Sequence, residues 1–224
     1  MDIKFPQPND PKLAEFIGIM LGDGSMSIKK IKGQNRIKIT FNSKEQQYIN
    51  FVKNLIEKLF NVTPILKFRK KENTADLFIF RRGVINHLMD LGLALSPKRN
   101  NAKIPESFLN NDLELDVLRG CFDTDGSVVL ANNNGTLYPR LEIKVCPSPM
   151  QKQIPEILCR RGFRFGVYDI VNGEKRIQMN GKSQLEKWIK LVKFSNIKHI
   201  TKANRILKSS AGWNFSSHRF RGLF

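Results

Sequence analysis

The sequence has few of the residues that build disulfide or zinc scaffolds. It contains three cysteines and three histidines among 224 residues. An odd number of cysteines with no Cys-x-x-Cys pair argues against both a disulfide framework and a zinc site, and fits a reducing compartment. The histidines show no metal-ligand spacing either. We therefore interpret six residues as structural or surface positions: Cys121, Cys146, Cys159, His87, His199 and His218.

Long apolar runs are also missing. The longest, around residues 16–21, is far shorter than the roughly 20 residues that cross a bilayer. The first ten residues include two aspartates and two prolines and have no apolar centre, which argues against a signal peptide. We therefore expect no membrane partner and an intracellular protein, in the cytoplasm, nucleoid or an organelle matrix, that is not secreted.

Acidic residues are scarce compared with basic ones. Twenty Asp and Glu stand against 38 Lys and Arg, which gives a formal net charge of +18. A basic surface of this size predicts a polyanionic partner, most often nucleic acid. The hydrophobic content of 41% and the chain length suffice for one large domain or two small ones. Charge alone leaves a passive RNA-binding protein and an enzyme equally open.

One internal repeat is present. Residues 13–25 read LAEFIGIMLGDGS and residues 115–127 read LDVLRGCFDTDGS. Each is an apolar helical stretch that ends in Asp-Gly-Ser, and the two Asp-Gly pairs begin 102 residues apart, at Asp23 and Asp125.

The same pattern follows each copy. Residues 36–41 (RIKITF) and 140–145 (RLEIKV) alternate strictly between polar and apolar side chains, which predicts half-buried strands. The other expected strands are 25–30, 65–69, 77–81, 127–131, 165–171 and 176–180, and the other expected helices are 44–60, 84–91, 150–161 and 183–192.

The order helix, strand, strand, helix, strand, strand, helix therefore occurs twice. It predicts an α+β protein whose helices and antiparallel sheets are segregated. We expect an N-terminal half at 10–100, a linker at 101–111, a C-terminal half at 112–202 and a basic tail at 203–224. Whether the tail packs as a short helix or binds DNA is open.

Small residues mark one face of each repeated helix. Gly18 and Gly22 are four residues apart in the first copy, and Gly120 and Thr124 hold the same places in the second. Residues at this spacing share a helix face, and small ones allow two backbones to approach closely. A helical glycine costs about 1 kcal/mol relative to alanine, which suggests a packing role. We predict that the two helices pair through these faces, and that the glycine after each acid ends its helix as a left-handed cap.

This pairing places two carboxylates side by side. Asp23 and Asp125 would stand at helix carboxyl ends, where negative charge is disfavoured, and would repel each other. A divalent cation removes both penalties, and oxygen ligands suit Mg²⁺ or Mn²⁺. We expect the two aspartates to bind such an ion, helped by the carbonyls of Gly22 and Thr124. One Asp-Gly pair alone is more typical of a turn, so the prediction depends on the matched context of two.

The two motifs resemble a known pair. Residues 16–24 (FIGIMLGDG) and 118–126 (LRGCFDTDG) are similar to the double signature of LAGLIDADG homing endonucleases. The second copy is the closer match, since Leu21 occupies the place of the first acid in the first copy. Residues 103–109 (KIPESFL) are similar to the segment that precedes the second motif in this family. The resemblance extends to about residue 205.

The resemblance implies two pseudo-symmetric α/β/β/α/β/β/α halves joined by a two-helix interface. Each half offers a curved four-stranded antiparallel sheet to the DNA major groove, and the last acid of each motif binds metal. The implied activity is double-strand cleavage at a long, loosely palindromic site by a monomer. The family's catalytic lysine maps onto Lys103, and Lys198 is our choice for its counterpart. Asn42 resembles a polar residue near the metal, although Cys146 is a poor equivalent in the other half.

The polar strand faces are the expected DNA-binding surface. Arg and Lys recognise guanine in the major groove, but many contact only phosphate and add affinity without sequence information. The predicted DNA-binding residues are Arg36, Lys38, Thr40, Lys67, Arg69, Arg81, Arg82, Arg140, Glu142, Lys144, Arg164, Arg176 and Gln178.

Two other functions remain open on the same fold. One is an RNA maturase that assists splicing of its own intron, with intron RNA as a partner. The other is a DNA-binding regulator without nuclease activity, which would be expected to have lost one acid. An intein is disfavoured, because the sequence begins at Met1, ends in Leu223-Phe224 rather than His-Asn, and leaves no length for a splicing domain.

Overall fold

The computed structural model describes residues 2–28 and 35–211. The first half comprises α1 (Pro11–Leu21), β1 (Gly24–Ser27), β2 (Arg36–Asn42), α2 (Gln46–Phe60), β3 (Ile65–Arg69), η1 (Lys70–Glu72), β4 (Thr74–Ile79) and α3 (Arg82–Asp90). After η2 (Glu106–Phe108), the second half comprises α4 (Leu113–Asp125), β5 (Gly126–Asn133), β6 (Thr136–Val145), α5 (Met150–Arg160), β7 (Gly166–Asp169), η3 (Val171–Gly173), β8 (Lys175–Asn180), α6 (Lys182–Leu191) and α7 (Ile197–Ala211).

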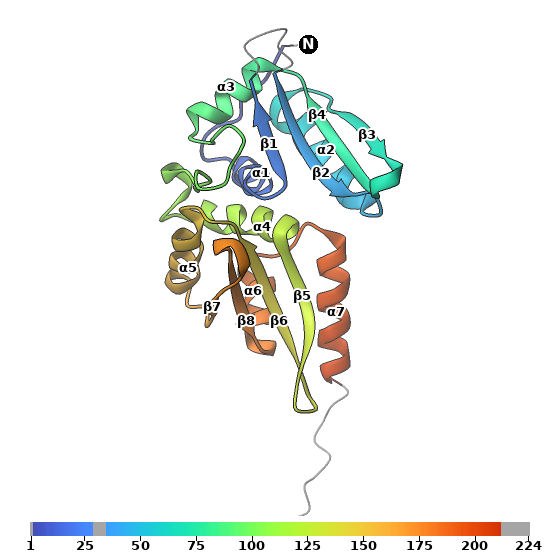
Figure 1. Cartoon of the computed structure of the whole chain (residues 1–224), viewed down its shortest axis with the longest axis vertical. Coiled ribbons are helices and arrows are strands. Elements are labelled where there is room, and N and C mark those ends of the chain that lie inside the picture. Colours follow the sequence, from blue (N-terminus) through green and yellow to red (C-terminus); the bar gives the residue numbers. More distant parts are fainter. Residues whose placement is uncertain (1, 29–34, 212–224) are drawn as a thin grey trace, which may run out of the picture.

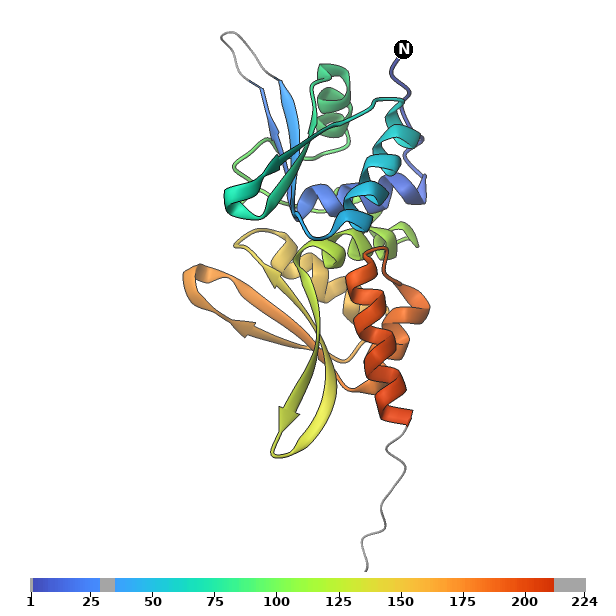
Figure 2. The ribbon, with the colours of Figure 1, turned by 90° about the vertical axis from the view of Figure 1, so that its right-hand side faces the viewer.

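Each half contains one four-stranded antiparallel sheet. The strand orders are β1-β2-β4-β3 and β5-β6-β8-β7, so the second half repeats the topology of the first. The two halves are stacked along the long axis of the molecule, with α1 and α4 between them (Figure 1). Seen from the side, the strands lie on one side of the molecule, while α1, α2, α6 and α7 lie on the other (Figure 2). The predicted α+β architecture is confirmed.

Alternation along the central strands separates a core face from a polar face. Ile37, Ile39 and Phe41 of β2 are buried, as are Leu141 and Ile143 of β6. The residues between them remain partly or fully exposed. Because side chains in a strand alternate between the two faces of the sheet, the polar residues of both sheets share the side opposite the helices.

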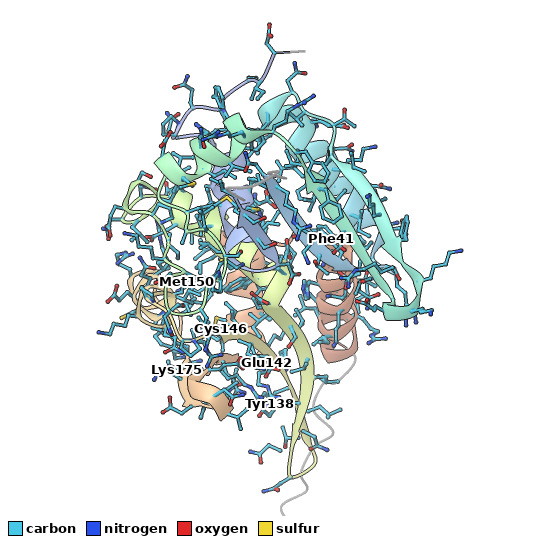
Figure 3. All side chains as sticks on the ribbon, turned by 45° about the horizontal axis from the view of Figure 1, so that its top comes forward. Phe41, Tyr138, Glu142, Cys146, Met150 and Lys175 are labelled. Carbon is cyan, nitrogen blue, oxygen red and sulfur yellow. The ribbon has the colours of Figure 1, made fainter. Side chains whose placement is uncertain are left out.

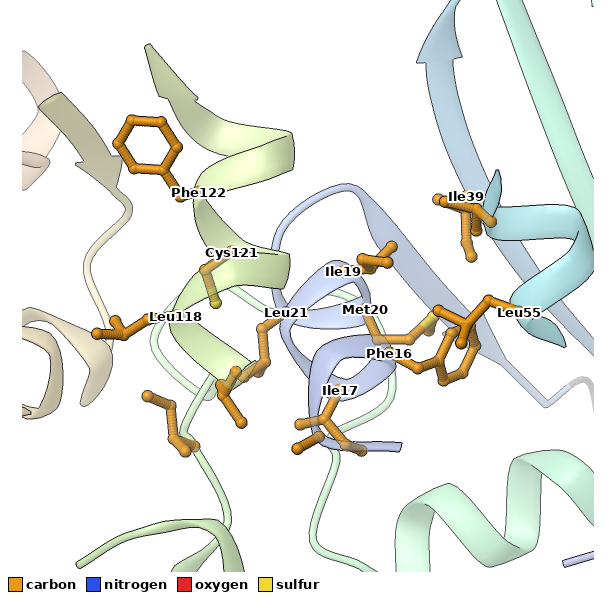
Figure 4. Close-up of a cluster of buried hydrophobic side chains, with 14 of the residues drawn as sticks. Phe16, Ile17, Ile19, Met20, Leu21, Ile39, Leu55, Leu118, Cys121 and Phe122 are labelled. Atoms are coloured by element: carbon orange, nitrogen blue, oxygen red, sulfur yellow. The ribbon is translucent and has the colours of Figure 1, made fainter. Parts of the chain in front are cut away.

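Helices α1 and α4 pack backbone to backbone, as predicted. A Cβ at Gly18 would lie 2.2 Å from the carbonyl oxygen of Val117, and one at Gly120 would lie 2.2 Å from that of Glu15. The contact therefore depends on the missing side chains. Apolar side chains point away from it into both cores, with Phe16 toward Leu55 and β2 on one side (Figure 4).

A buried ion pair joins the two halves beside this contact. The guanidinium of Arg119 in α4 lies 3.0 Å from Glu15 of α1 and also bonds Asp116. Its Nη1 donates to the carbonyl of Val192 at 3.2 Å. Since the Glu15 and Arg119 side chains are 7% and 15% exposed, the pair is shielded from solvent and needs all of these contacts.

The prediction that Gly24 and Gly126 form left-handed helix caps is wrong. Gly24 and Gly126 begin β1 and β5, and neither adopts a left-handed backbone. Glycine is required at both positions for a steric reason instead. A Cβ at Gly24 would lie 2.6 Å from Cα of Met20, and one at Gly126 would lie 2.5 Å from the carbonyl oxygen of Phe122. The chain reverses so tightly after each helix that no side chain fits.

Several expected boundaries shift. Strand β4 starts at Thr74 rather than 77, and β1 ends at Ser27, while residues 29–34 lie outside the described part of the chain. Helix α7 starts at Ile197, so it crosses the expected end of the C-terminal half at 202, and residues 212–224 lie outside the described part. Among residues 2–28 and 35–211, no helix is long and apolar enough to cross a membrane.

Candidate active site and DNA-binding surface

The two motif aspartates converge where α1 and α4 end. Asp23 lies in the turn after α1, and Asp125 is the last residue of α4. Gly22, next to Asp23 in the chain, lies against Asp125, since a Cβ built on it would lie 3.0 Å from Oδ2 of Asp125. Both aspartates are exposed. The predicted pair of carboxylates therefore forms at the base of the two sheets, open to solvent.

Their surroundings disfavour the ionised form. Both residues reach solvent, yet the protein packed around their carboxyl groups partly desolvates them. This desolvation, followed by the charge of Asp23, raises the pKa of Asp125 to about 7. The pKa of Asp23 is also raised, first by desolvation and then by the Glu45 carboxylate, against the opposing charges of Lys98 and Lys198. Two carboxylates held close together in this way attract a proton or a metal cation.

Lys98 is the cation whose charge acts most strongly on both aspartates. Its Nζ donates to the carbonyls of Met20 at 2.9 Å, Leu21 at 2.8 Å and Gly22 at 2.5 Å. These are carbonyls that a helix end leaves without internal partners. Desolvation lowers the pKa of Lys98, while Asp125 and Asp23 oppose the shift.

Pairing with β1 holds Lys98 in place. The backbone N–H of Ser96 donates to the carbonyl of Met26 at 2.9 Å, and the Met26 N–H donates to Oγ of Ser96 at 3.2 Å. Further along, the N–H of Ala102 donates to the Lys98 carbonyl at 2.8 Å. The segment after the first half is thus fixed against the strand that follows Asp23.

In the described part of the chain, no bond ties Lys103, the lysine assigned from the motif, to the aspartates. Its side chain is exposed, and no hydrogen bond or ion pair of it occurs among residues 2–28 and 35–211. The neighbouring Ile104 is buried; its backbone N–H donates to Oε1 of Gln153 in α5 at 2.8 Å, and its carbonyl accepts from Nε2 of the same side chain at 2.9 Å. The structure therefore brings Lys98, rather than Lys103, to the aspartates.

The charge of Lys198 acts on Asp23, and Lys198 pairs with an acid that the sequence analysis did not identify. Its Nζ lies 3.0 Å from Oε1 of Glu45, the residue before α2. Oε2 of Glu45 accepts a hydrogen bond of 2.8 Å from Nδ2 of Asn196. Glu45 thus links the start of α2 in the first half to the start of α7 in the second.

Asp123 of α4 also binds the segment that precedes α7. Its Oδ2 accepts hydrogen bonds from the backbone N–H groups of Ser195 at 2.6 Å and Asn196 at 3.1 Å. Burial raises the pKa of Asp123 to about 7, and the two backbone hydrogen bonds oppose that shift. This first acid of the second motif therefore has a structural task, which is to fix the chain just before α7.

The remaining predicted site residues form hydrogen bonds within the protein. Oδ1 of Asn42 accepts from the N–H of Lys44 at 3.0 Å, which makes Asn42 a turn residue. The carbonyl of Gly22 bonds Lys98. The hydroxyl of Thr124 donates back to the carbonyls of its own helix, at Gly120 and Cys121.

The first sheet presents a polar face crossed by internal bonds. Thr40 Oγ1 donates to Asp76 at 2.7 Å, and Arg69 Nε lies 2.9 Å from the same carboxylate. Arg36 and Lys67 lie over the ring of Phe78, at 6.0 and 5.8 Å from its centre. Asp76 and Phe78, which the sequence analysis did not select, therefore order the predicted DNA-binding side chains.

The second sheet has a comparable network around Glu142. Arg140 lies 3.2 Å from this carboxylate, and Ser127 and Gln178 donate to it at 3.2 and 3.4 Å. Figure 3 shows Glu142 midway along β6, with Cys146 nearer the junction of the halves and Tyr138 farther out. Glu142 therefore organises this face as Asp76 does the first.

The other predicted DNA-binding residues lie either on the strands or outside them. Lys38 projects from the polar face of β2, and Lys144 and Arg176 face each other across β6 and β8. Lys144 also lies 2.8 Å from Glu174. Three arginines lie off the strands: Arg81 and Arg82 at the start of α3, and Arg164 just before β7.

The aspartate pair fits a divalent cation that is shared with substrate. No cluster of three or more His, Cys, Asp or Glu residues suited to a metal occurs in the described parts of the chain. Two exposed carboxylates and a nearby carbonyl leave most positions around an ion to water and phosphate oxygens. This donor set suits Mg²⁺ and the similar Mn²⁺.

Comparison with known proteins decides the family. A model described as the LAGLIDADG DNA endonuclease family matches residues 15–185. The chain belongs to this family. The family match agrees with the paired motif, the two sheets and the meeting aspartates.

Solved structures share the fold. Mesophilic variants of the homing endonuclease I-DmoI give a TM-score of 0.56 at 18% identity, over 81% of this chain and 95% of that one. The LAGLIDADG meganuclease I-AabMI bound to uncleaved DNA gives 0.60 at 13% identity, over 90% of each chain. I-DmoI in complex with DNA and Mn gives 0.58 at 17% identity, over 83% of this chain and 97% of that one.

Curated relatives are much longer. The replication factor C small subunit of Methanocaldococcus jannaschii is 25% identical over 206 residues, which are 88% of this chain and 10% of that protein. The glutamine–fructose-6-phosphate aminotransferase of the same organism is 26% identical over 226 residues, which are 95% of this chain and 19% of that protein. The chain thus spans less than a fifth of either relative.

Proposed function

We propose that the chain is a site-specific DNA endonuclease of the homing type, which cuts both strands of a long site with Mg²⁺ or Mn²⁺. The observation that carries the proposal is the meeting of Asp23 and Asp125, one from each half, between two polar sheet faces. Two similar sheets beside one carboxylate pair suit a duplex with two related half-sites. Because both halves belong to one chain, we expect a monomer and a loosely palindromic target.

The sheets bind and orient the DNA in this proposal. Lys38, Lys144 and Arg176 supply charge for phosphates, while the network of Glu142 with Gln178 holds groups suited to base edges. Prior ordering of these side chains reduces the entropy lost on binding.

The aspartates hold the cation that the cleavage requires. When bound, it activates water and stabilises the leaving oxygen of the phosphodiester. Asp23 and Asp125 bind and place it, and their raised pKa values mean that the negative charge of the pair is unfavourable without a cation. Lys98 fixes the carboxyl end of α1 and partly offsets the negative charge. We assign it, with Lys198, the stabilisation of charge that develops on the phosphate.

The relatives support mobility of the gene. A stretch of about 200 residues is shared with proteins whose names describe a replication factor and an aminotransferase. Similar stretches within otherwise unlike proteins are expected of a sequence that inserts itself at new sites. These relatives carry the stretch inside a longer polypeptide, so they do not themselves favour an intron. The intron-type form of such an element, with its DNA target at the insertion site, is our proposal.

A selection from random duplex DNA tests the proposal. Duplexes that bind in Ca²⁺ would be recovered and then transferred to Mg²⁺, and the product ends sequenced. We expect double-strand breaks at one long site. Tight sequence-specific binding without cleavage in Mg²⁺ or Mn²⁺ would contradict the nuclease and leave a regulator or maturase, for which intron RNA is the next ligand.

A further inference from the structure

A second basic surface lies on the helical side of the molecule. A groove of about 750 Å³ separates the start of α2 from α7. Figure 2 shows α7 beneath the start of α2, with the strands on the opposite side. The groove therefore does not belong to the sheet faces proposed to hold the target duplex.

Cations dominate its walls. Lys44 stands on the α2 side, and Lys198, Lys202 and Arg205 stand on α7. Ile197 is the single apolar residue among those that line the groove. A peptide ligand would need apolar or aromatic anchor pockets, whereas a polyanion needs charge.

Helix α7 extends the surface as a stripe. Lys198, Lys202, Arg205 and Lys208 follow one another at spacings of four, three and three residues, which places them on one face. The opposite face carries buried residues such as Ala203 and Ile206. At 1.5 Å per residue, the stripe is about 15 Å long, which corresponds to about four phosphates of one strand at 3.4 Å each. A second hollow of about 640 Å³, beside Arg205 and Lys208, continues the groove along the helix.

Most of these cations lack an acidic partner. Lys198 pairs with Glu45, but within residues 2–28 and 35–211 no ion pair involves Lys44, Lys202, Arg205 or Lys208. Residues 197–211 contain no acid at all. Helix α2 also begins at the groove with no side-chain cap on its N–H groups, which adds partial positive charge to the same space.

We propose that this groove and the cationic face of α7 bind a phosphodiester backbone that is separate from the duplex on the sheets. The ligand is duplex DNA beyond the cleaved site, because the groove shares Glu45 and Lys198 with the surroundings of the aspartates. A strand of RNA presents the same repeating phosphates and is the alternative outcome of the test. This binding function goes beyond cleavage: it would keep a second nucleic-acid segment on the enzyme beside the active site, to which Glu45 and Lys198 also belong.

Binding of two random-sequence probes by the full chain tests the proposal. The probes are a 40-base-pair DNA duplex and a 40-nucleotide single-stranded RNA, each titrated in Ca²⁺ at several salt concentrations. The test variant is Lys202→Glu with Arg205→Glu. The matched control is Lys152→Glu with Lys190→Glu, which makes the same charge change at exposed lysines on α5 and α6. A Lys202→Gln, Arg205→Gln variant covers the case in which charge reversal unfolds α7.

We expect the groove variant to weaken binding of the duplex by about tenfold or more. For the duplex, the slope of log affinity against log salt should fall by about 2, because two phosphate contacts are lost. The control should change either affinity by less than about threefold. A loss for RNA alone would overturn the assignment to DNA and identify RNA as the ligand. Equal effects of groove and control variants on the duplex would also overturn the proposal, and since the readout is binding, this result is independent of whether the chain cleaves DNA.

Discussion

The two halves share a fold but secure their aspartates by opposite chemistry. In the first half, the segment after the last strand and helix donates to the motif helix: Lys98 inserts its ammonium among the terminal carbonyls of α1. In the second half, the motif helix receives instead: the Asp123 carboxylate accepts the backbone N–H groups of Ser195 and Asn196. Each arrangement satisfies polar groups that burial would otherwise leave unpaired.

This difference explains why the two motifs diverge at one position. Leu21 occupies the place that Asp123 holds in the second copy, and both side chains are buried, at 7% and 1% exposure. An acid at position 21 has no backbone N–H pair to bind, because Lys98 already serves that helix end through its carbonyls. Pseudo-symmetry is therefore maintained in the aspartates that we propose bind metal and relaxed in the residues that support them.

The largest expected effect comes from the ion pair that joins the halves. Arg119→Met should lower the free energy of unfolding by about 3–5 kcal/mol, because Glu15 and Asp116 lose their partner in a shielded site. Chemical denaturation measures it. Adding Glu15→Gln should restore part of the loss, and Lys182→Met, which breaks an exposed pair at 3.8 Å, should cost less than about 1 kcal/mol. Equal losses for Arg119 and Lys182 would contradict the assigned role.

The glycine contact tests the symmetry of the interface. Gly18→Ala and Gly120→Ala should each destabilise the fold by about 3 kcal/mol, because each new Cβ would meet a backbone carbonyl of the other helix at 2.2 Å. Gly83→Ala in α3 is the control. Its closest neighbour is the flexible end of Ile3 at 3.1 Å, so it should be neutral or stabilise by up to about 1 kcal/mol. Strongly unequal effects at 18 and 120 would mean that the two helices do not approach as equals.

Substitution of the lysines tests whether the motif or the geometry identifies the lysine that matters most for cleavage. We expect Lys98→Met to slow cleavage by about a hundredfold, Lys198→Met by about tenfold, and Lys103→Met by less than threefold. Single-turnover rates in Mg²⁺ measure this, with binding in Ca²⁺ as the control for target recognition. If Lys103→Met has the greatest effect, the motif assignment is right and the geometric one is wrong.

The smallest effect concerns pH. Burial, followed by the charges of Lys198 and Lys202, lowers the pKa of His199 to about 3. Below a pH of about 6.5 the unfolded chain therefore binds a proton at His199 that the folded chain does not, so the contribution of this residue to stability falls by about 1 kcal/mol per pH unit as pH decreases. The raised pKa values of Asp123 and Asp125 act in the opposite sense, because the folded chain binds their protons at higher pH than the unfolded chain does. His199→Phe should remove this contribution, so the free energy of unfolding of the variant should rise relative to wild type by about 1 kcal/mol per unit as pH falls from 6.5 to 5. His87 of the first half is less buried, so His87→Phe should change the pH dependence less. Equal slopes in wild type and His199→Phe would contradict this role.

The sequence predicted the elements whose pattern is local. Alternation along RIKITF and RLEIKV located β2 and β6, and the glycines on each motif helix predicted the contact of α1 with α4. Because each pattern occurs in both copies of the repeat, each prediction had two supporting observations. These features depend on spacing within one element, so they can be recognised without knowing the fold.

Features that depend on contacts between distant segments were missed. Lys98 reaches the aspartates because Ser96 pairs with Met26, seventy residues earlier, and nothing near Lys98 in the sequence indicates that pairing. Glu45 is likewise significant through Asn196 and Lys198 of the other half. Helix α7 was not predicted because its many cations mask a narrow apolar stripe.

The central claim is that aspartates from two unlike halves form one active site. The most direct measurement is the rate of cutting of each strand of the selected site by Asp23→Asn and by Asp125→Asn, with binding in Ca²⁺ measured in parallel. The account predicts that either substitution slows both strands by at least about a hundredfold while binding is retained. If either variant cuts both strands at the wild-type rate, that aspartate holds no required metal and the account of a shared site is wrong.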